Sequence, residues 1–355
     1  SLGGGDSPLL VLLTYPDMPE EKLKRTINFQ VKGKKSSGRI RIAVIGAGGF
    51  ARSAHLPNIQ SISDKFSLRA VVSRTGPSAT STAKLFGAEY ASTDYKEILA
   101  DPKIDAVIIS TRHHLHASLA LEALKSGKHV LVEKPLAIKE NEVAALNNFI
   151  NDNKDSPVLM TGYNRRFSPY ANQISKLVAN RTAPFIFKYR MNAGFISSDH
   201  WVQGPEGGGR NIGEACHIYD LFTFFSNSKV KNISAHAIKP QTSYYGRNDN
   251  FVATLTFADG SVTTLTYTSL GHRDHPKETA ELYVDGKLAV LEDYQRLTIH
   301  GANRLNLKTA IQQKGIKEEL LSFASCIQKG TWPIAWWQQM QVFEISRLIE
   351  QKIHL

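Results

Sequence analysis

The side chains best suited to acid–base chemistry stand close together in the sequence. Glu214, His217 and Asp220 follow one another at intervals of three residues, which places them on one side of a helix. A histidine titrates near neutral pH, so His217 can act as a general acid or base, and a neighbouring carboxylate can fix its tautomer. We therefore predict that this segment moves a proton, with His217, Glu214 and Asp220 as catalytic residues.

Two other interpretations of this segment stay open. A Glu-x-x-His pair also presents two metal ligands on one helix face, but no matching second pair is visible in the sequence, so we expect no metal. Alternatively, His217 is a structural histidine. Cys216 diverges from its helical neighbour, and we expect it and Cys326 to be buried structural thiols.

Lys134 stands at the end of a predicted strand, His129–Glu133, and just before Pro135. An ammonium group beside a hydroxyl lowers the cost of negative charge on oxygen, which favours removal of a hydride from a carbinol. We expect Glu133 to hold Lys134 in place and Pro135 to fix the backbone, through a trans or a cis peptide bond. Lys134 is therefore a candidate catalytic residue.

The glycines after the predicted strand Ile42–Ile45 have the spacing of a dinucleotide-binding turn. Gly46 allows a sharp turn, Gly48 lets the backbone approach a pyrophosphate, and Ala51 lets the next helix pack close to the strand. The phosphates would then lie at the amide end of that helix. Glycine-rich turns alone are common, and the strand–turn–helix context makes this one informative. The predicted cofactor contacts here are Gly46, Gly48, Gly49, Phe50 and Ala51.

The end of the second predicted strand bears on the choice of nicotinamide cofactor. An acidic residue there binds the ribose hydroxyl of NAD, whereas an arginine accepts the extra phosphate of NADP. This chain has Ser73, Arg74 and Thr75 at that point, and no acid. Guanidinium and hydroxyl donors suit a phosphate, so we favour NADP(H) over NAD(H), with a merely solvated Arg74 as the alternative.

Histidines gather after the third predicted strand, Asp105–Ser110. Ligands of doubly wound sheets bind at the carboxyl ends of the strands, so we expect Thr111, His113 and His116 beside the cofactor. Single histidines of this loop alternatively cap the following helix or face solvent.

Patterns along the chain predict an α/β fold with two domains. Strands and helices alternate over residues 39–161, which indicates a Rossmann domain with a doubly wound parallel sheet. Residues 162–355 combine strands, tight turns and two closing helices, which indicates an α/β domain with a large open, mainly antiparallel sheet. Residues 1–38 contain a short strand pattern, Leu9–Thr14, and a polar, basic stretch expected to be an arm or linker. The predicted strands of the second domain are 185–191, 232–238, 251–257, 261–268, 281–284 and 288–291.

Composition narrows the class of protein. The 355 residues are 42% hydrophobic and 21% charged, as in ordinary globular proteins, with a formal net charge of +11. No nucleic-acid-binding motif accompanies this charge, so we expect a solvated basic surface or attraction for anionic small molecules, and no nucleic acid. No apolar run is long enough to span a membrane. Two cysteines in so long a chain fit a reducing cytoplasm.

Together, these motifs resemble the glucose–fructose oxidoreductase / inositol dehydrogenase / MocA (Gfo/Idh/MocA) family. The resemblance runs from about Arg39 to the C-terminus and rests on Gly46–Ala51, Thr111–His116, Gly127–Ala137 and Gly213–Asp220. It implies reversible NAD(P)-dependent oxidation or reduction at a carbon of a sugar, sugar derivative or cyclitol, often in a homo-oligomer formed through the C-terminal sheet.

The resemblance also implies roles for single residues. Lys134 would polarise the substrate oxygen, and His217 would move the hydroxyl proton. The nicotinamide end would be flanked by Thr111, His113, His116 and Glu133. The substrate pocket would be lined by Tyr163, Arg166, Trp201 and Asn211.

Two positions depart from the family's pattern. The usual Thr-Pro-Asn loop is Thr111-Arg112-His113 here, and the aspartate often found four residues before the catalytic histidine is Gly213, with the acid at Glu214. These variants resemble a subgroup in which the module follows a zinc alcohol-dehydrogenase-like half. Residues 9–15 and the basic linker would then be the tail of that half.

Two alternatives to a sugar oxidoreductase use the same fold. One is a non-redox enzyme that cleaves glycosides through transient oxidation by tightly held NAD. The other is a cofactor-sensing regulatory module. A steady-state change in NAD(P)H distinguishes an oxidoreductase from the first alternative, and the effect of replacing Lys134 or His217 on turnover distinguishes it from the second.

Overall fold

The first sheet has the topology of a dinucleotide-binding domain. In the computed structural model, which describes residues 25–29, 38–242, 244–301 and 305–355, its strands lie in the order β1-β4-β3-β2-β5-β6-β7. Neighbouring strands from β4 to β7 are parallel, and β1 runs antiparallel to β4. The strands are β1 (Thr26–Asn28), β2 (Ile40–Ile45), β3 (Phe66–Val72), β4 (Tyr90–Ser92), β5 (Ala106–Ile109), β6 (His129–Val132) and β7 (Leu159–Thr161).

Both faces of this sheet are buried, as the side chains of the central strand β2 show. Ile42 and Val44 join one apolar cluster, Ala43 and Ile45 join the other, and all four are at most 3% exposed. A parallel sheet built by strand–helix alternation acquires such cover on each face. The helices between its strands are α1 (Leu56–Ser61), α2 (Gly76–Phe86), α3 (Tyr95–Ala100), α4 (His116–Lys125) and α5 (Glu140–Asp152).

The second sheet is large and mainly antiparallel. Its strands lie in the order β15-β14-β13-β12-β8-β11-β10-β9, and only the β8–β11 pair is parallel. The strands are β8 (Ile186–Asn192), β9 (Val230–Ala237), β10 (Phe251–Phe257), β11 (Val262–Thr268), β12 (Glu278–Val284), β13 (Lys287–Glu292), β14 (Arg296–His300) and β15 (Leu305–Lys308).

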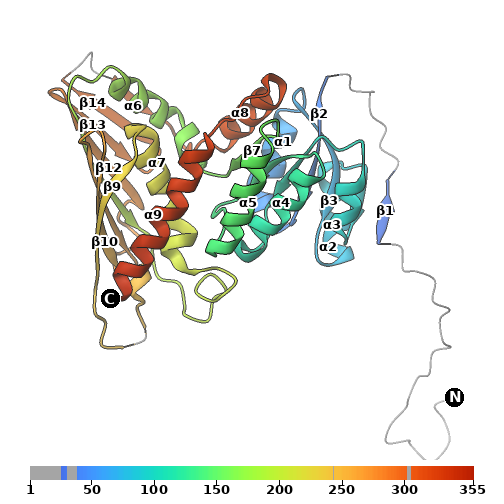
Figure 1. Cartoon of the computed structure of the whole chain (residues 1–355), viewed down its shortest axis with the longest axis horizontal. Helices are drawn as coiled ribbons and strands as arrows, with labels where there is room; N and C mark the ends of the chain where they lie inside the picture. The colour runs from blue at the N-terminus through green and yellow to red at the C-terminus, as the bar shows by residue number, and fades with distance from the viewer. Residues whose placement is uncertain (1–24, 30–37, 243, 302–304) are drawn as a thin grey trace, which may run out of the picture.

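One face of the second sheet is covered by helices, and the other faces outward (Figure 1). Along β8, Phe187, Tyr189 and Met191 are buried, whereas Ile186 is 51% exposed. The covering helices are α6 (Pro169–Ala179), α7 (Cys216–Ser226) and α9 (Trp336–His354), while α8 (Ile316–Lys329) contacts α1 of the first domain. Across the described ranges, no helix combines the length and the apolar character needed to cross a bilayer.

Helix α9 ties the two domains together. The Gln339 side chain accepts a hydrogen bond from the Thr161 amide (3.0 Å) and donates one to the Leu159 carbonyl (3.0 Å), at the edge of β7. Two residues further along, Gln341 accepts a hydrogen bond from the Val230 amide of β9 (3.1 Å). The same helix therefore contacts both sheets.

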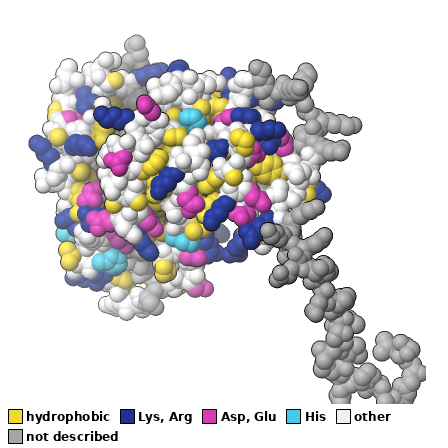
Figure 2. Space-filling view, turned by 45° about the vertical axis from the view of Figure 1, so that its right-hand side comes forward, with side chains coloured by type: hydrophobic (Ala, Val, Ile, Leu, Met, Phe, Trp, Pro, Cys, Tyr) yellow, Lys and Arg dark blue, Asp and Glu magenta, His cyan; other side chains and the backbone are white. Residues whose placement is uncertain are grey.

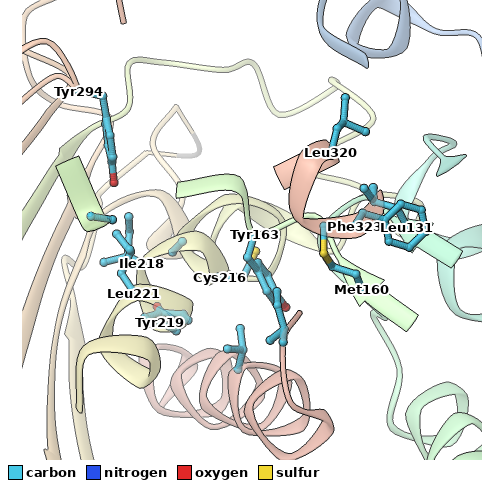
Figure 3. Packing of buried hydrophobic residues seen from close by; sticks show 14 of the residues in the cluster. Leu131, Met160, Tyr163, Cys216, Ile218, Tyr219, Leu221, Tyr294, Leu320 and Phe323 are labelled. Atoms are coloured by element: carbon cyan, nitrogen blue, oxygen red, sulfur yellow. The ribbon is translucent and has the colours of Figure 1, made fainter. Parts of the chain in front are cut away.

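Apolar packing also runs from one domain into the other. Phe323 of α8 lies in one cluster with Leu131 of β6 and Met160 of β7, and Tyr163 and Cys216 continue that cluster into the second domain (Figure 3). On the face of the molecule in Figure 2, basic side chains are interspersed with acidic ones rather than gathered into a continuous band.

The predicted fold class is confirmed, but several elements were not predicted. The prediction for the second domain omits β14, β15 and α6. Each of the two strands contains only two apolar residues, which is too short a pattern to distinguish from a loop.

Residues 26–28, predicted to belong to an arm or linker, form β1 at the edge of the first sheet. β1 pairs with β4, and Arg25 beside it forms an ion pair with Asp94 (N–O distance 2.8 Å). A three-residue strand with polar neighbours carries no periodic pattern, so the sequence could not reveal it. The predicted strand Leu9–Thr14 lies outside the described residues.

Candidate active site

A cavity of about 1000 Å³ lies at the carboxyl ends of β2, β3, β5 and β6. The second domain completes its wall with residues such as Arg165, Trp201 and His217. The predicted site residues that line it are Gly46, Gly48, Gly49, Phe50, Ser73, Arg74, Thr75, Thr111, His113, His116, Glu133, Lys134, Trp201, Glu214 and His217.

The glycine turn after β2 is shaped as a phosphate cradle requires. Gly46 has a φ of +99°, and a β-carbon there would lie 2.6 Å from the Ser110 carbonyl oxygen, so only glycine fits. Gly48 and Gly49 have no neighbouring atoms within 4 Å of a β-carbon position, which leaves their backbone open. The helical turns begin at Gly49, so free amides face the cavity's end. These features fit a dinucleotide. Ala51 is fully buried and does not line the cavity, contrary to its prediction as a cofactor contact.

The end of β3 offers a second set of donors. Ser73, Arg74 and Thr75 line the cavity after Val72, and no carboxylate lines it there. A guanidinium and two hydroxyls can hold a ribose phosphate, and they can also accommodate an unphosphorylated ribose.

Lys134 is held by a backbone carbonyl of the second domain. Its Nζ donates to the Gly213 oxygen at 2.7 Å, and the Lys134–Pro135 peptide bond is cis. Glu133 was predicted to hold the Lys134 ammonium group, but it does not bind that group. Its carboxylate lies 2.7 Å from Nε2 of His55 and accepts a hydrogen bond from the Lys134 amide. Glu133 therefore fixes the backbone of Lys134 rather than its side chain. The sequence analysis missed His55, which lies four residues after Ala51 at the end of the turn that follows the glycine motif.

The ring of His113 is held in one orientation by residues of the second domain. Its Nδ1 donates to the Gly207 carbonyl (2.7 Å), and the Trp201 ring meets it edge-on at 4.9 Å between ring centroids. The tight contact with Gly213, where a β-carbon would lie 2.9 Å from Cε1, closes the other side. Burial lowers the pKa of His113 to about 3, with Lys134 adding to the shift, so the ring is neutral.

His116 is fully buried and forms a structural link. Its Nδ1 lies 2.8 Å from the Pro135 carbonyl oxygen and its Nε2 lies 3.2 Å from that of Thr111. The ring thereby joins the loop after β5 to the loop after β6, at the residue that follows Lys134. His116 therefore stabilises the cavity wall by holding these two loops together.

His217 differs from Glu214 and Asp220 in that one of its polar atoms has no hydrogen-bond partner among the described residues. It is 6% exposed, and among the described residues Nδ1 has no hydrogen-bond partner. Burial lowers its pKa well below the ordinary value, and the cationic Arg165 and Lys134 lower it further. The imidazole is therefore neutral at neutral pH and able to accept a proton.

The prediction that Asp220 assists His217 is wrong. Both Asp220 oxygens accept hydrogen bonds from the Arg166 guanidinium, at 2.9 and 2.5 Å, and the carboxylate is fully buried. Arg166 is bound on its other side to Gln338 (2.8 Å) and does not line the cavity. Arg166, predicted to bind substrate, instead forms an internal ion pair with Asp220 in this structure.

Glu214 also has partners other than His217. It accepts hydrogen bonds from Arg210 (2.9 Å), Tyr267 (2.6 Å) and Lys277 (2.8 Å). Burial alone would raise its pKa, but the two cations and the phenol bring the pKa of Glu214 below its ordinary value. A wide π-helical turn, Asn211–Ala215, precedes α7, so the ordinary helical spacing assumed for Glu214 does not hold.

Two further residues predicted for the substrate pocket lie behind the cavity wall. Tyr163 is 1% exposed and packs edge-on to His217 from behind, with 6.4 Å between ring centroids, and it does not line the cavity. Asn211 is fully buried, where it donates to the Ser346 carbonyl (2.9 Å) and accepts from the Tyr219 hydroxyl (2.6 Å). A sequence does not reveal which polar side chains are consumed by internal hydrogen bonds.

Sequence reasoning also missed residues that do line the cavity. Arg165 faces it, although the neighbouring Arg166 was predicted, because the 3₁₀ turn Asn164–Phe167 directs the two side chains to different partners. The missed residues also include Asn164, Arg210, Lys314 and Ile316. No motif surrounds Lys314, so only the fold could bring it here. Within the described part of the chain, no group of three His, Cys, Asp or Glu side chains is arranged to hold a metal.

Comparison with known proteins agrees with this geometry. The model of the GFO/IDH/MocA oxidoreductase family, NAD-binding Rossmann fold, matches residues 40–161. The model of the GFO/IDH/MocA C-terminal domain matches residues 182–303. Together the two models cover most of the chain from β2 onward.

Individual relatives are more distant. The uncharacterized oxidoreductase YrbE of Bacillus subtilis (strain 168) is 28% identical over 63% of this chain and 65% of its own length. The scyllo-inositol 2-dehydrogenase (NAD(+)) of the same organism is 26% identical over 83% of this chain and 88% of its own. A solved levoglucosan dehydrogenase, in complex with NADH and levoglucosan, shares the fold with a TM-score of 0.76 at 20% identity, covering 89% of this chain and 97% of that one. The chain belongs to the Gfo/Idh/MocA family of NAD(P)-dependent oxidoreductases.

Proposed function

We propose that the protein transfers a hydride between a nicotinamide cofactor and a CH–OH carbon of a sugar, sugar derivative or cyclitol. One observation carries the proposal: Lys134 and a neutral His217 line the same cavity as the glycine turn after β2. A cation that can hold a substrate oxygen and a base that can take its proton therefore lie beside a dinucleotide cradle.

Lys134 and His217 have different roles: Lys134 stabilises charge, and His217 transfers a proton. Lys134, held by the Gly213 carbonyl, presents its ammonium group to the reacting oxygen and stabilises negative charge there. His217 accepts the hydroxyl proton as the alcohol is oxidised and returns it in the reverse direction. The nicotinamide, when bound, supplies the hydride acceptor or donor. His113 and Trp201 exclude water from one wall of the cavity.

The proposed cofactor is NADP(H), with NAD(H) as the alternative. Arg74, Ser73 and Thr75 supply donors for a ribose phosphate, and no carboxylate lines that end of the cavity to bind a free ribose hydroxyl. Titration with NADPH and NADH, followed by nicotinamide fluorescence, compares the two dissociation constants. Tighter binding of NADH would contradict the preference for NADP(H).

Turnover tests the catalytic assignment. We expect His217→Asn to lower kcat by about 10²–10⁴-fold and Lys134→Met by about 10²–10³-fold, with cofactor binding retained. The measurement is steady-state NAD(P)H formation with a panel of sugars and cyclitols. Cofactor binding without turnover of any substrate, or unchanged turnover in both variants, would contradict the proposal.

The outer face of the second sheet is the proposed interface of a homo-oligomer. Ile186, Val252 and Tyr283, on β8, β10 and β12, are 51%, 44% and 37% exposed on that face. We expect Val252→Lys with Tyr283→Lys to reduce the oligomer in sedimentation experiments. A cytoplasmic location remains part of the proposal, and the two free thiols of Cys216 and Cys326 fit it. The proposed zinc alcohol-dehydrogenase-like half concerns residues outside the described ranges.

A further inference from the structure

A buried carboxylate with two cationic partners lies beside the reacting end of the cavity. Glu278 of β12 is fully buried and accepts hydrogen bonds from Arg165 Nε (2.7 Å) and Nη2 (2.9 Å) and from the Tyr189 hydroxyl (2.6 Å). Lys314 Nζ lies 2.7 Å from Oε1 of the same carboxylate. Burial opposes ionisation, but Arg165 and Lys314 bring the pKa of Glu278 to about 2. Two cations surround one anion, so the cluster carries one positive charge in excess.

This excess charge faces the cavity. Arg165 and Lys314 line the cavity, whereas Glu278 does not. The bonds to Glu278 use Nε and Nη2 of Arg165, which leaves Nη1 for another acceptor, and the Lys314 side chain is 22% exposed. Asn164, which also lines the cavity, donates to the Lys314 carbonyl (2.9 Å) and holds that loop against the 3₁₀ turn. The donors are therefore held in place before any ligand binds.

The cluster belongs to the substrate end of the cavity. Arg165, Lys314 and His217 all line the cavity from the second domain, whereas the predicted cofactor contacts line it from the first domain. The predicted cofactor contacts after β2 and β3 contribute nothing to this cluster. A group bound by Arg165 and Lys314 would therefore be part of the molecule whose hydroxyl reaches His217.

A second carboxylate of the site, that of Glu214, is partly exposed and has a different relation to the cavity. Glu214 also has two cationic partners, Arg210 and Lys277, but Glu214 itself lines the cavity and Lys277 does not. The cavity is therefore lined there by a balanced pair, Arg210 with Glu214. The Glu278 cluster, in contrast, presents two cations to the cavity while their shared anion stays behind the wall.

We propose that the substrate is a carboxylate-bearing sugar or cyclitol, and that Arg165 and Lys314 bind its carboxylate. The inference rests on the proposed dehydrogenase function and adds the class of substrate to it. One excess positive charge matches a monoanion better than a phosphate dianion. A neutral sugar would leave the free donors of both side chains to water, whereas a carboxylate forms charge-assisted hydrogen bonds with them.

Matched pairs of acid and neutral sugars test this inference on the cofactor-loaded protein. The probes are D-glucuronate against D-glucose and D-gluconate against D-glucitol, compared by calorimetric binding and by kcat/KM. We expect at least one acid to be preferred about 10–100-fold, the range that one or two hydrogen bonds to a charged group supply. Lys314→Met should remove about tenfold of that preference, and Lys314→Arg should retain it.

Lys277→Met is the matched control, because Lys277 also pairs with a carboxylate, Glu214, but does not itself line the cavity; this variant should leave the preference unchanged. Equal or better binding of every neutral sugar would overturn the inference, and so would a preference for the acid that Lys314→Met does not alter. If neutral sugars were still turned over with the cofactor, the proposed function would stand. A Lys314-dependent preference for D-glucose 6-phosphate over both acids would overturn the assignment of a carboxylate. Failure to bind either cofactor would overturn both proposals together.

Discussion

At the scale of single residues, His113 and Gly213 depend on each other. The ring of His113 lies so close to Gly213 that a β-carbon at that position would be 2.9 Å from Cε1. The family's usual pattern has a smaller asparagine at the first position and an aspartate at the second. The two departures therefore form one compensated change, in which the histidine ring occupies the space that the aspartate would need.

Introducing the family's aspartate alone should destabilise this protein. Gly213→Asp forces the two side chains into the same space, and we expect a loss of about 1–3 kcal/mol in the free energy of unfolding. Combining it with His113→Asn should recover most of that loss. Urea unfolding of the four proteins of this double-mutant cycle measures the coupling, and additive effects would contradict the compensation.

The neutral state of His217 sets the pH dependence of oxidation. A base must be unprotonated to accept the hydroxyl proton, and burial, together with Arg165 and Lys134, lowers the pKa of His217 well below its ordinary value of 6.5. We therefore expect kcat/KM for alcohol oxidation to hold its value as the pH falls through neutrality and to decline only below pH 6.5. A half-maximal point at or above pH 6.5 that disappears in His217→Asn would contradict this assignment.

The places of these residues in the fold were easier to predict from the sequence than their hydrogen-bond partners. Gly46, Arg74, His113 and Lys134 each follow a buried strand, and parallel topology brings such positions to one edge of the sheet. The partners came from distant segments that no local pattern connects. Lys134 is held by a carbonyl 79 residues away, which only the packing of the two domains could reveal.

At the scale of elements, predictability follows burial. The strands of the first sheet are apolar on both faces, so short runs such as β5, with all four residues buried, are evident in the sequence. β1 and β15 are edge strands and β14 lies next to β15; few residues of these three strands are buried, and the sequence analysis missed them. The π-helical turn before α7 has no sequence signature and altered which residues share a face.

The attachment of α9 to β7 should contribute strongly to stability. Gln339→Leu would leave the Thr161 amide and hydroxyl and the Leu159 carbonyl without their buried partner. An unsatisfied buried group costs about 1–3 kcal/mol, so we expect a loss of at least about 2 kcal/mol in urea unfolding. The control is Gln351→Leu on the exposed side of the same helix. Equal effects of the two variants would contradict a specific role for Gln339.

At the scale of the whole molecule, the two domains should unfold together. Helix α9 and the cluster containing Phe323, Leu131 and Met160 join both sheets, and the cavity lies between the domains. We expect one calorimetric transition, which cofactor at 100 times its dissociation constant stabilises by about 2.7 kcal/mol. Two transitions, with only one shifted by cofactor, would contradict a shared core.

The Gln339–Thr161 contact also has a consequence for how the protein is made. The two residues are 178 positions apart, so β7 leaves the ribosome well before the side chain that completes its edge. At about 5–20 residues per second, the delay is on the order of 10–35 s. Throughout that time the nascent cofactor-binding half presents an unpaired strand, the kind of edge that recruits other chains. The edge of β7 is therefore completed late in synthesis, after nearly the whole chain has been made.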